Sequence, residues 1–368
     1  MTTMQLMPST PRGGLDAGHA ARFLASDRTQ REKPWDIDPK GGFDIGWEYA
    51  QLGQHLPRSE NEADEAAMRE VRNGFAAGAV HFQRRNATAT GEDQRFVRKY
   101  LQLKLHAWMR GRIFKEDVTP EYLKRINQDI CPITRKPMTV ATGRPTDGSV
   151  DRLLNDGCYA RGNLVVISTG ANQAKGKLSY REVLDIVAFN REFRGLSPIE
   201  WERMAALMGI VSDKDGVLPL LVMPPPGVSM VNRYAALQLV AVLAPFYSDG
   251  RTGITRTLVA QMRKVVPGKK AKKLMEEFFR YAWGAIRHPS EQAFKTADAA
   301  DQYQRFMELA GDIWRDPYLL ERFRLWMAAM PVGSERACVD AVCRVVPGIL
   351  RCSTNPRDWE LDKRGYVS

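Results

Sequence analysis

The sequence has few of the features that mark extracellular, membrane or zinc-binding proteins. It holds only five Cys in 368 residues, and no two of them form a C-x-x-C pair. An odd count without paired spacing argues against a disulfide framework and a zinc knuckle, so we expect buried, reduced thiols and no zinc. No apolar run approaches the ~20 residues that a membrane span requires, and the N-terminus lacks the pattern of a secretory signal. The expectation is a cytoplasmic protein without a membrane contact.

The sequence has fewer acidic than basic residues. Lys and Arg number 54 against 43 Asp and Glu, which gives a net charge of +11. Two stretches carry the excess: residues 131–181 hold eight Lys or Arg against three Asp, and residues 251–280 hold nine against two Glu. Clustered positive charge favours a polyanionic partner, most commonly nucleic acid. The alternative is a solvated basic surface that binds nothing.

Helix-capping sequences recur along most of the chain and indicate a mainly α protein. They predict helix starts at Ser59, Thr90, Thr119, Ser179 and Ser197. Five parts are expected: an irregular, partly disordered arm (1–58), a helical lead-in (59–129), a small α+β module (130–195), a helix and PPPG linker (196–225) and a helical C-terminal domain (226–368).

The module interrupts the helical pattern. The pieces SVDRLL (149–154) and NLVVIS (163–168) predict two strands joined by a turn, and TGANQAKG predicts a helix that Ser168 or Thr169 caps. In such a hairpin followed by a helix, Asp151 lies in the first strand and Asn172 in the first helical turn, so both could face one cleft. Carboxylate and amide oxygens suit Mg²⁺ or Mn²⁺.

Basic side chains surround these two polar residues in the sequence. Because phosphates attract Lys and Arg, we expect contacts to nucleic acid from four of them: Arg152, Arg161, Lys175 and Lys177. A second basic run, KKAKK, follows a Pro-Gly turn; it is either a helix start that meets the DNA backbone or a solvated helix face. Its lysines are Lys269, Lys270, Lys272 and Lys273.

Several short motifs follow one another in a fixed order through the module. They are C-x-I-T (131–134), S-x-D-R (149–152), G-x-Y (157–159), G-N (162–163) and N-x-x-K (172–175). This order resembles the HNH, or ββα-metal, nucleases of phages and mobile elements. The resemblance covers residues 131 to about 180 and implies a small central ββα-metal module in a mainly α protein.

The resemblance also implies a role for each matching residue. Asp151 and Asn172 would ligate the metal beside the scissile phosphate, and Asn163 would tie down the loop between the strands by hydrogen bonds. Arg152 stands where the family has its general-base His. An arginine stays protonated, so it cannot be a general base, but it could clamp a phosphate or stabilise the transition state.

The absence of a His beside Asp151 leaves three possibilities open. The metal alone could activate the water, a His from elsewhere could act, or the module could bind DNA without cutting it. His81 and His106, on the helices just before the module, are the nearest candidates. Asn155 is expected to be only a turn residue, and Tyr159 a core residue.

The leading functional hypothesis is a divalent-metal-dependent DNA endonuclease of phage or mobile-element type. The second is a non-catalytic DNA-binding or assembly protein that retains a degenerate HNH-like module. The third is a structural phage protein whose residues 226–368 contact a phage or host protein.

Overall fold

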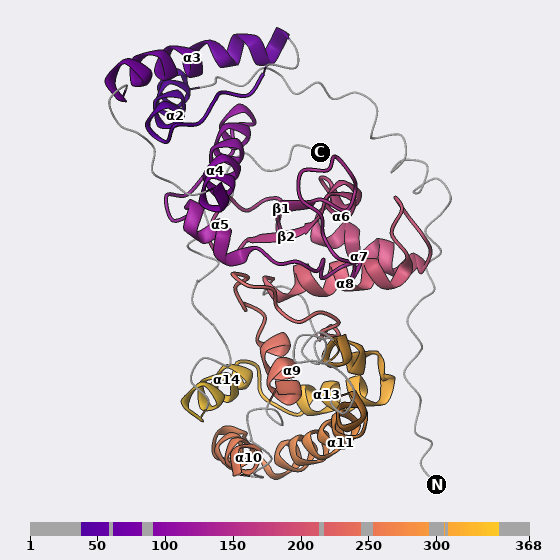
Figure 1. The fold of residues 1–368 in the computed structure, drawn as a ribbon. Coiled ribbons are helices and arrows are strands. Elements are labelled where there is room, and N and C mark those ends of the chain that lie inside the picture. Colours follow the sequence, from indigo (N-terminus) through magenta and orange to yellow (C-terminus); the bar gives the residue numbers. More distant parts are fainter. Residues whose placement is uncertain are drawn as a thin grey trace.

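The computed structural model describes residues 38–58, 62–82, 91–212, 217–243, 253–293, 305 and 308–345. The described chain is mainly helical and contains one two-stranded antiparallel sheet, as the capping sequences predicted (Figure 1). None of the described helices is both long and apolar enough to cross a membrane. In chain order the helices are α2 (Pro39–Gln51), α3 (Glu62–Phe82), α4 (Gly91–Met109), α5 (Pro120–Ile126), α6 (Thr169–Lys175), α7 (Tyr180–Phe189), α8 (Pro198–Ile210), α9 (Arg233–Leu243), α10 (Gly253–Val265), α11 (Lys269–Ala293), the 3₁₀ helix η2 (Ile313–Arg315), α13 (Pro317–Ala328) and α14 (Ser334–Val345).

The hairpin and the helix that follows it lie where the sequence predicted them. Strand β1 (Gly148–Arg152) pairs with β2 (Leu164–Ser168), with Ser149 opposite Ile167 and Asp151 opposite Val165. Of the two candidate caps, Ser168 is the N-cap of α6, and its side-chain oxygen accepts from the backbone N–H of Ala171.

Three other predicted caps are confirmed. The Thr119 hydroxyl accepts from the N–H of Tyr122 at the start of α5. Ser179 and Ser197 each form a capping box, which opens α7 and α8 respectively. Helices α3 and α4 occupy the predicted lead-in, but the predicted caps Ser59 and Thr90 lie outside the described residues. Local capping chemistry therefore sets the starts of α5, α6, α7 and α8.

Part of the N-terminal segment departs from the prediction. Residues 38–51 were expected to be irregular, but α2 spans most of them, with Asp38 as its N-cap and Pro39 at its first position. The Asp38 carboxylate accepts from the N–H groups of Lys40 and Gly41. Residues 52–58 of the predicted arm form neither helix nor strand, and residues 1–37 lie outside the described residues.

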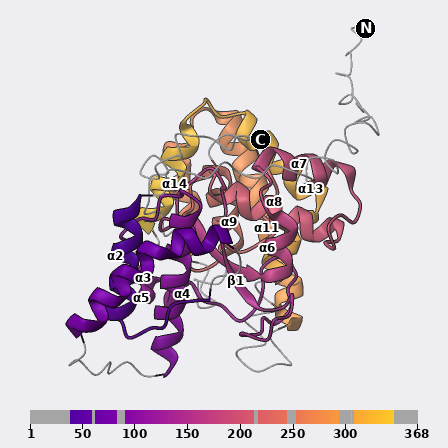
Figure 2. The same ribbon diagram turned by 90° about the horizontal axis from the view of Figure 1, so that it is seen from above.

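The hairpin is buried on both faces. All five residues of β2 are buried. Val165 and Ile167 belong to the larger core, whereas Leu164 and Val166, on the opposite face, belong to the smaller one. Helices α2 to α5 supply the smaller core, and α6 to α11, α13 and α14 the larger. In Figures 1 and 2, α2 to α5 gather on one side of the hairpin.

The C-terminal helices share the larger core with the module and are not separated from it by a free linker. The PPPG segment was expected to be such a linker, but Gly227 accepts through its carbonyl from the Tyr122 hydroxyl at 3.4 Å, and the next residues bridge to Gly162. Arg135 binds both carboxylate oxygens of Asp312 at 2.8 Å and so joins the module to the segment before η2. The linker prediction is wrong because the segment packs against the hairpin loop.

Two glycines let α2 and α3 approach to backbone contact. A Cβ added at Gly46 would lie 1.8 Å from the carbonyl oxygen of Val71, and one at Gly74 would lie 1.9 Å from the carbonyl oxygen of Phe43. Such distances are far below van der Waals contact, so only glycine permits this helix pair.

Replacement of Gly46 by Ala should therefore force the two helices apart. We expect Gly46→Ala to lower the free energy of unfolding by ~2 kcal/mol or more, as overpacking does. Gly284→Ala is the matched control, since Gly284 also lies in a helix but an added Cβ would meet no atom of the described residues within 4 Å; it should be neutral or stabilising by up to ~1 kcal/mol. Urea unfolding followed by circular dichroism measures both. Equal effects would contradict the close helix contact.

Candidate functional site

The carboxylate at the centre of the HNH-like pattern is paired inside the protein. Asp151 lies in β1 on the face that α6 covers, and its side chain is only 7% exposed. The Nζ atom of Lys175, at the end of α6, lies 3.0 Å from its Oδ2 and 3.3 Å from its Oδ1. The residue proposed to hold a metal thus forms a buried ion pair with a neighbouring cation.

Lys175 is fully buried, with 0% of its side chain exposed. Besides Asp151, its ammonium donates to the backbone carbonyl of Arg152 at 2.7 Å and to Oδ1 of Asn155 at 3.2 Å. An ammonium has three N–H groups, and three acceptors receive them. That Lys175 holds a phosphate stays a prediction, and this geometry does not favour it, because the ammonium lies in the interior with all three N–H groups engaged.

Burial is the main influence on the pKa of both Asp151 and Lys175. It raises the pKa of the Asp151 carboxyl above its ordinary value, and the Lys175 ammonium offsets part of that rise. It lowers the pKa of the Lys175 amine, again with a partial offset from Asp151. Both directions disfavour the charged forms, so burial of the pair costs free energy that the mutual attraction only partly returns. Removal of one partner alone should be far more costly than removal of both.

Arg152 is also turned into the protein. It is 9% exposed, its guanidinium donates to the carbonyl of Gly157 at 3.1 Å, and it stacks over the Tyr159 ring at 4.8 Å. Since β-strand neighbours face opposite sides, Arg152 points away from the Asp151 face. That Arg152 clamps a phosphate or contacts DNA stays a prediction, and this arrangement does not favour it, because the guanidinium contacts the hairpin loop at Gly157 and Tyr159.

Asn163 ties down the loop between the strands. Its Oδ1 accepts from the N–H of Leu154 at 2.9 Å, and its Nδ2 donates to the carbonyls of Leu154 and Cys158, each at 3.1 Å. The side chain is completely buried. These are hydrogen bonds of the kind that the family resemblance implied for this residue, and they make Asn163 a structural residue that does not reach the surface.

Asn172 lies on the same face of α6 as Lys175. Its Nδ2 donates to the Ser149 hydroxyl at 2.8 Å, and its side chain is half-buried. Asn172 and Lys175 are three residues apart on the helix, and their partners Ser149 and Asp151 are two apart on the strand. Two polar contacts, Asn172 to Ser149 and Lys175 to Asp151, therefore hold α6 against one face of β1.

This donor set does not fit a divalent cation as it stands. Such an ion at the Asp151 oxygens would face the positive charge of Lys175, which already neutralises the carboxylate. Nor does any group of three or more His, Cys, Asp and Glu in the described ranges come together as a metal site. That Asp151 and Asn172 share an Mg²⁺ or Mn²⁺ ion stays a prediction, and this geometry does not favour it.

The two candidate histidines lie on helices of the smaller core. His81, in α3, packs its ring against Trp47 and Phe82, with ring centroids 5.2 and 4.8 Å apart. His106 is exposed in the last turn of α4. Helix α4 packs against the face of the hairpin opposite Asp151. Neither placement supplies a general base to the Asp151 face.

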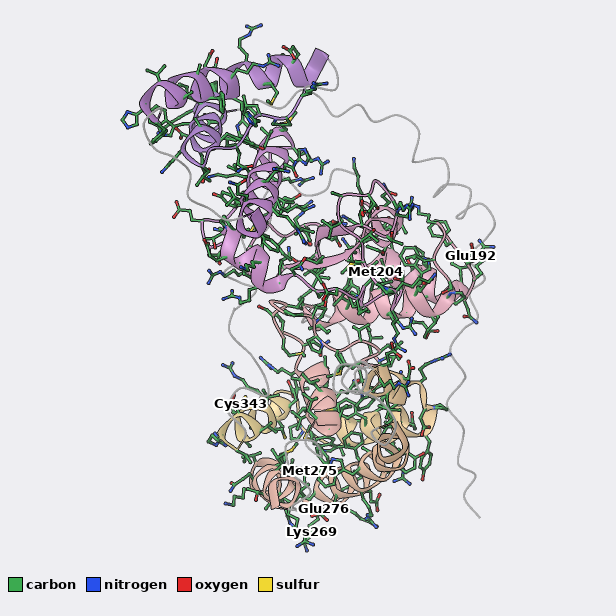
Figure 3. The ribbon with its side chains drawn as sticks, viewed as in Figure 1. Glu192, Met204, Lys269, Met275, Glu276 and Cys343 are labelled. Atoms are coloured by element: carbon green, nitrogen blue, oxygen red, sulfur yellow. The ribbon has the colours of Figure 1, made fainter. Side chains whose placement is uncertain are left out.

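The other predicted nucleic-acid contacts are spread over the molecule. Arg161 donates through Nε to the carbonyl of Asp117 at 2.7 Å and stacks over Tyr122, while Lys177 is exposed just after α6. The KKAKK run opens α11, as predicted. Figure 3 shows Lys269 at the outer end of the C-terminal helices, well away from the hairpin. The two basic stretches thus do not form one continuous surface around Asp151.

Two residues that the sequence analysis did not assign to the site help to build it. Asn155, expected to be only a turn residue, contacts Lys175 and donates through Nδ2 to the carbonyls of Gly176 and Leu178. Asp147 organises the loop before β1: hydroxyls of Thr139 and Thr142 donate to its carboxylate, and the Thr139 bond is the main cause that lowers its pKa to about 2. Nothing in the local sequence signals the Asn155 contacts, because Lys175 is twenty residues away.

No protein-family model, curated protein or solved structure matches this chain. The functional assignment therefore depends on the contacts of its own residues.

These contacts predict different costs for the two asparagines of the pattern. Asn163→Ala would leave buried backbone groups of the loop without partners, and we expect it to lower the free energy of unfolding by ~3 kcal/mol. Asn172→Ala, which removes one half-buried hydrogen bond, should cost about 1 kcal/mol or less. Urea unfolding gives both values. A larger loss for Asn172→Ala would contradict the structural role of Asn163.

Proposed function

We propose that this protein binds nucleic acid, with DNA as the expected class, and that its HNH-like ββα module is a framework and not a hydrolytic centre. The observation that carries the second part is the ion pair between Asp151 and the fully buried Lys175. It neutralises the carboxylate that hydrolysis would need for a metal. The position of the general base is occupied by Arg152, whose guanidinium is engaged with Gly157 and Tyr159.

The start of α11 supports the first part of the proposal. Lys269, Lys270 and Lys273 are exposed, whereas Ala271 and Met275 turn into the core. No acidic residue occupies the first turn of α11. Because the N-terminus of a helix carries a partial positive charge, lysines there oppose the helix dipole and reduce its stability slightly. Together with the partial positive charge of the helix N-terminus they form a positive end, which suits phosphates.

The neighbouring helix adds to this charge. Arg263 and Lys264 lie in the last turn of α10, directly before the turn at Gly268 that leads into α11. Arg263 forms an ion pair with Glu276, and Lys273 lies 3.9 Å from Glu277. These two acidic residues offset only part of the positive charge of the two helix ends. A polyanion is the partner that such a surface favours.

Removal of this charge should weaken binding to DNA of any sequence. We expect the triple variant Lys269→Gln, Lys270→Gln, Lys273→Gln to bind a fluorescently labelled duplex roughly tenfold or more weakly at low salt. The slope of log K against log salt should fall by up to ~0.9 for each phosphate contact removed. Fluorescence anisotropy over a salt series measures both quantities.

A matched control removes three positive charges elsewhere. Lys40, Arg69 and Arg324 are exposed and lie outside both basic stretches, so their replacement by Gln should leave the salt slope nearly unchanged. An equal loss in the control would mean that only net charge matters. Binding that does not respond to salt would count against a nucleic-acid role.

DNA hydrolysis is the competing proposal, and one observation favours it. The buried Oδ2 of Asp151 makes no hydrogen bond with the described residues, although the Lys175 ammonium lies 3.0 Å away. The half-buried Asn172 projects from the same helix face as Lys175. Hydrolysis would require the ion pair to open before Asp151 could meet a metal.

A plasmid-nicking assay with Mg²⁺, Mn²⁺ or a chelator separates the two proposals. We expect wild-type protein to nick no faster than Asp151→Asn, which keeps an acceptor for the Lys175 ammonium. Arg152→His should destabilise the hairpin loop without producing activity, because it loses the contacts to Gly157 and Tyr159. Nicking that requires Mn²⁺ and disappears in Asp151→Asn would establish the endonuclease instead.

A further inference from the structure

Oxygen atoms of three residues, two at the end of β1 and one in the loop that follows, surround the Nζ atom of Lys175. The Asp151 carboxylate comes from the end of β1, with oxygens at 3.0 and 3.3 Å. The carbonyl of Arg152, at 2.7 Å, is the last of the strand, and Oδ1 of Asn155, at 3.2 Å, belongs to the loop. A carboxylate, a backbone carbonyl and an amide oxygen are the ligand types that hard cations such as Ca²⁺ prefer.

Other contacts hold these oxygens in place. Asn155 is fixed through its Nδ2, which donates to the carbonyls of Gly176 at 3.0 Å and Leu178 at 2.9 Å, so its Oδ1 is directed toward Lys175. Asp151 is 7% exposed, and its Oδ2 accepts no hydrogen bond in the described structure. A nearby cation stabilises such a buried carboxylate oxygen, and the Lys175 ammonium lies 3.0 Å from it.

We propose that these oxygens form a cation site in which the Lys175 ammonium is the resident, covalently tethered cation. The distances of 2.7 to 3.3 Å suit an ammonium and exceed those of Ca²⁺, ~2.3–2.6 Å, and Mg²⁺, ~2.0–2.1 Å. When the ammonium is removed, the site takes a free divalent ion. Ca²⁺ binds better than Mg²⁺, because Ca²⁺ accepts irregular oxygen shells and needs the smaller contraction.

The site differs from the one that the family resemblance implied. Its ligands beside Asp151 are the Arg152 carbonyl and Asn155, whereas Asn172 is engaged with Ser149. The tether also makes the native module independent of metal, since the cation is part of the chain. Cation binding at this site involves the folded module alone and is independent of nucleic-acid binding.

The test uses full-length Lys175→Met, which keeps an unbranched side chain but removes the ammonium. Thermal unfolding is followed in chelator, in MgCl₂ and in CaCl₂. In chelator the midpoint should fall by ~5 °C or more relative to wild type, because a buried carboxylate loses its counter-ion. CaCl₂ should recover at least half of that fall and MgCl₂ less, while wild type should show the same midpoint in all three solutions.

The double variant Asp151→Asn, Lys175→Met is the matched control. It lacks the uncompensated carboxylate, so it should unfold at a higher temperature than Lys175→Met in chelator and should not respond to Ca²⁺. Calorimetric titration with Ca²⁺ should give one site in Lys175→Met and none in wild type or the double variant.

Three results would overturn the proposal. One is a Ca²⁺ response of Lys175→Met no larger than that of the double variant. Another is Lys175→Met that stays unfolded both with and without Ca²⁺ while the double variant folds. The third is a saturable Ca²⁺ stabilisation of wild type that Asp151→Asn removes, which would show that the native site already takes a metal. DNA binding is not measured in any arm, so failure here is distinct from failure of the proposed function.

Discussion

Burial of the hairpin on both faces is the constraint on which the rest of the structure depends. One face of β2 packs against the helices that precede it and the other against the helices that follow. The buried polar side chains of the hairpin are shielded from water, so they must hydrogen-bond within the protein. Asp151 forms an ion pair with Lys175, Arg152 contacts Gly157 and Tyr159, and Asn163 hydrogen-bonds to the loop backbone. The HNH-like pattern is thereby converted into an internal network that joins strand, loop and helix.

The same network decides what chemistry the module can perform. A carboxylate beside an amide is a possible metal site when both reach solvent, but an ammonium close to that carboxylate offsets its negative charge and repels a divalent cation. Lys175 can reach Asp151 because α6 packs along β1, where Asn172 contacts Ser149 one helical turn earlier. A difference in the position of one basic side chain therefore separates a potential catalytic centre from a structural ion pair. For this reason the buried lysine weighs more in our proposal than the order of the motifs does.

The charge excess has a different distribution from the one that the motif would require. The side chains that match the pattern are mostly buried, whereas the exposed Lys269, at the start of α11, lies far from the hairpin in Figure 3. A nucleic-acid partner would then be held by helix ends in the C-terminal part, and the module would hold the two cores together. The bidentate contact between Arg135 and Asp312 couples these parts, because it fixes the turn before the hairpin to the segment before η2.

The sequence by itself determined the local features: the capped starts of α5, α7 and α8, the two strands and the helix after them. These depend on residues within about four positions or on strand alternation, which a sequence displays directly. The glycines of α2 looked like an irregular arm, and the prolines before Val228 like a linker, since their packing partners are remote in the chain. Only the tertiary structure placed Lys175 in the interior, where a charged side chain is rare unless paired. Its partner Asp151 lies 24 residues away, and only the packing of α6 on β1 brings the two charges together.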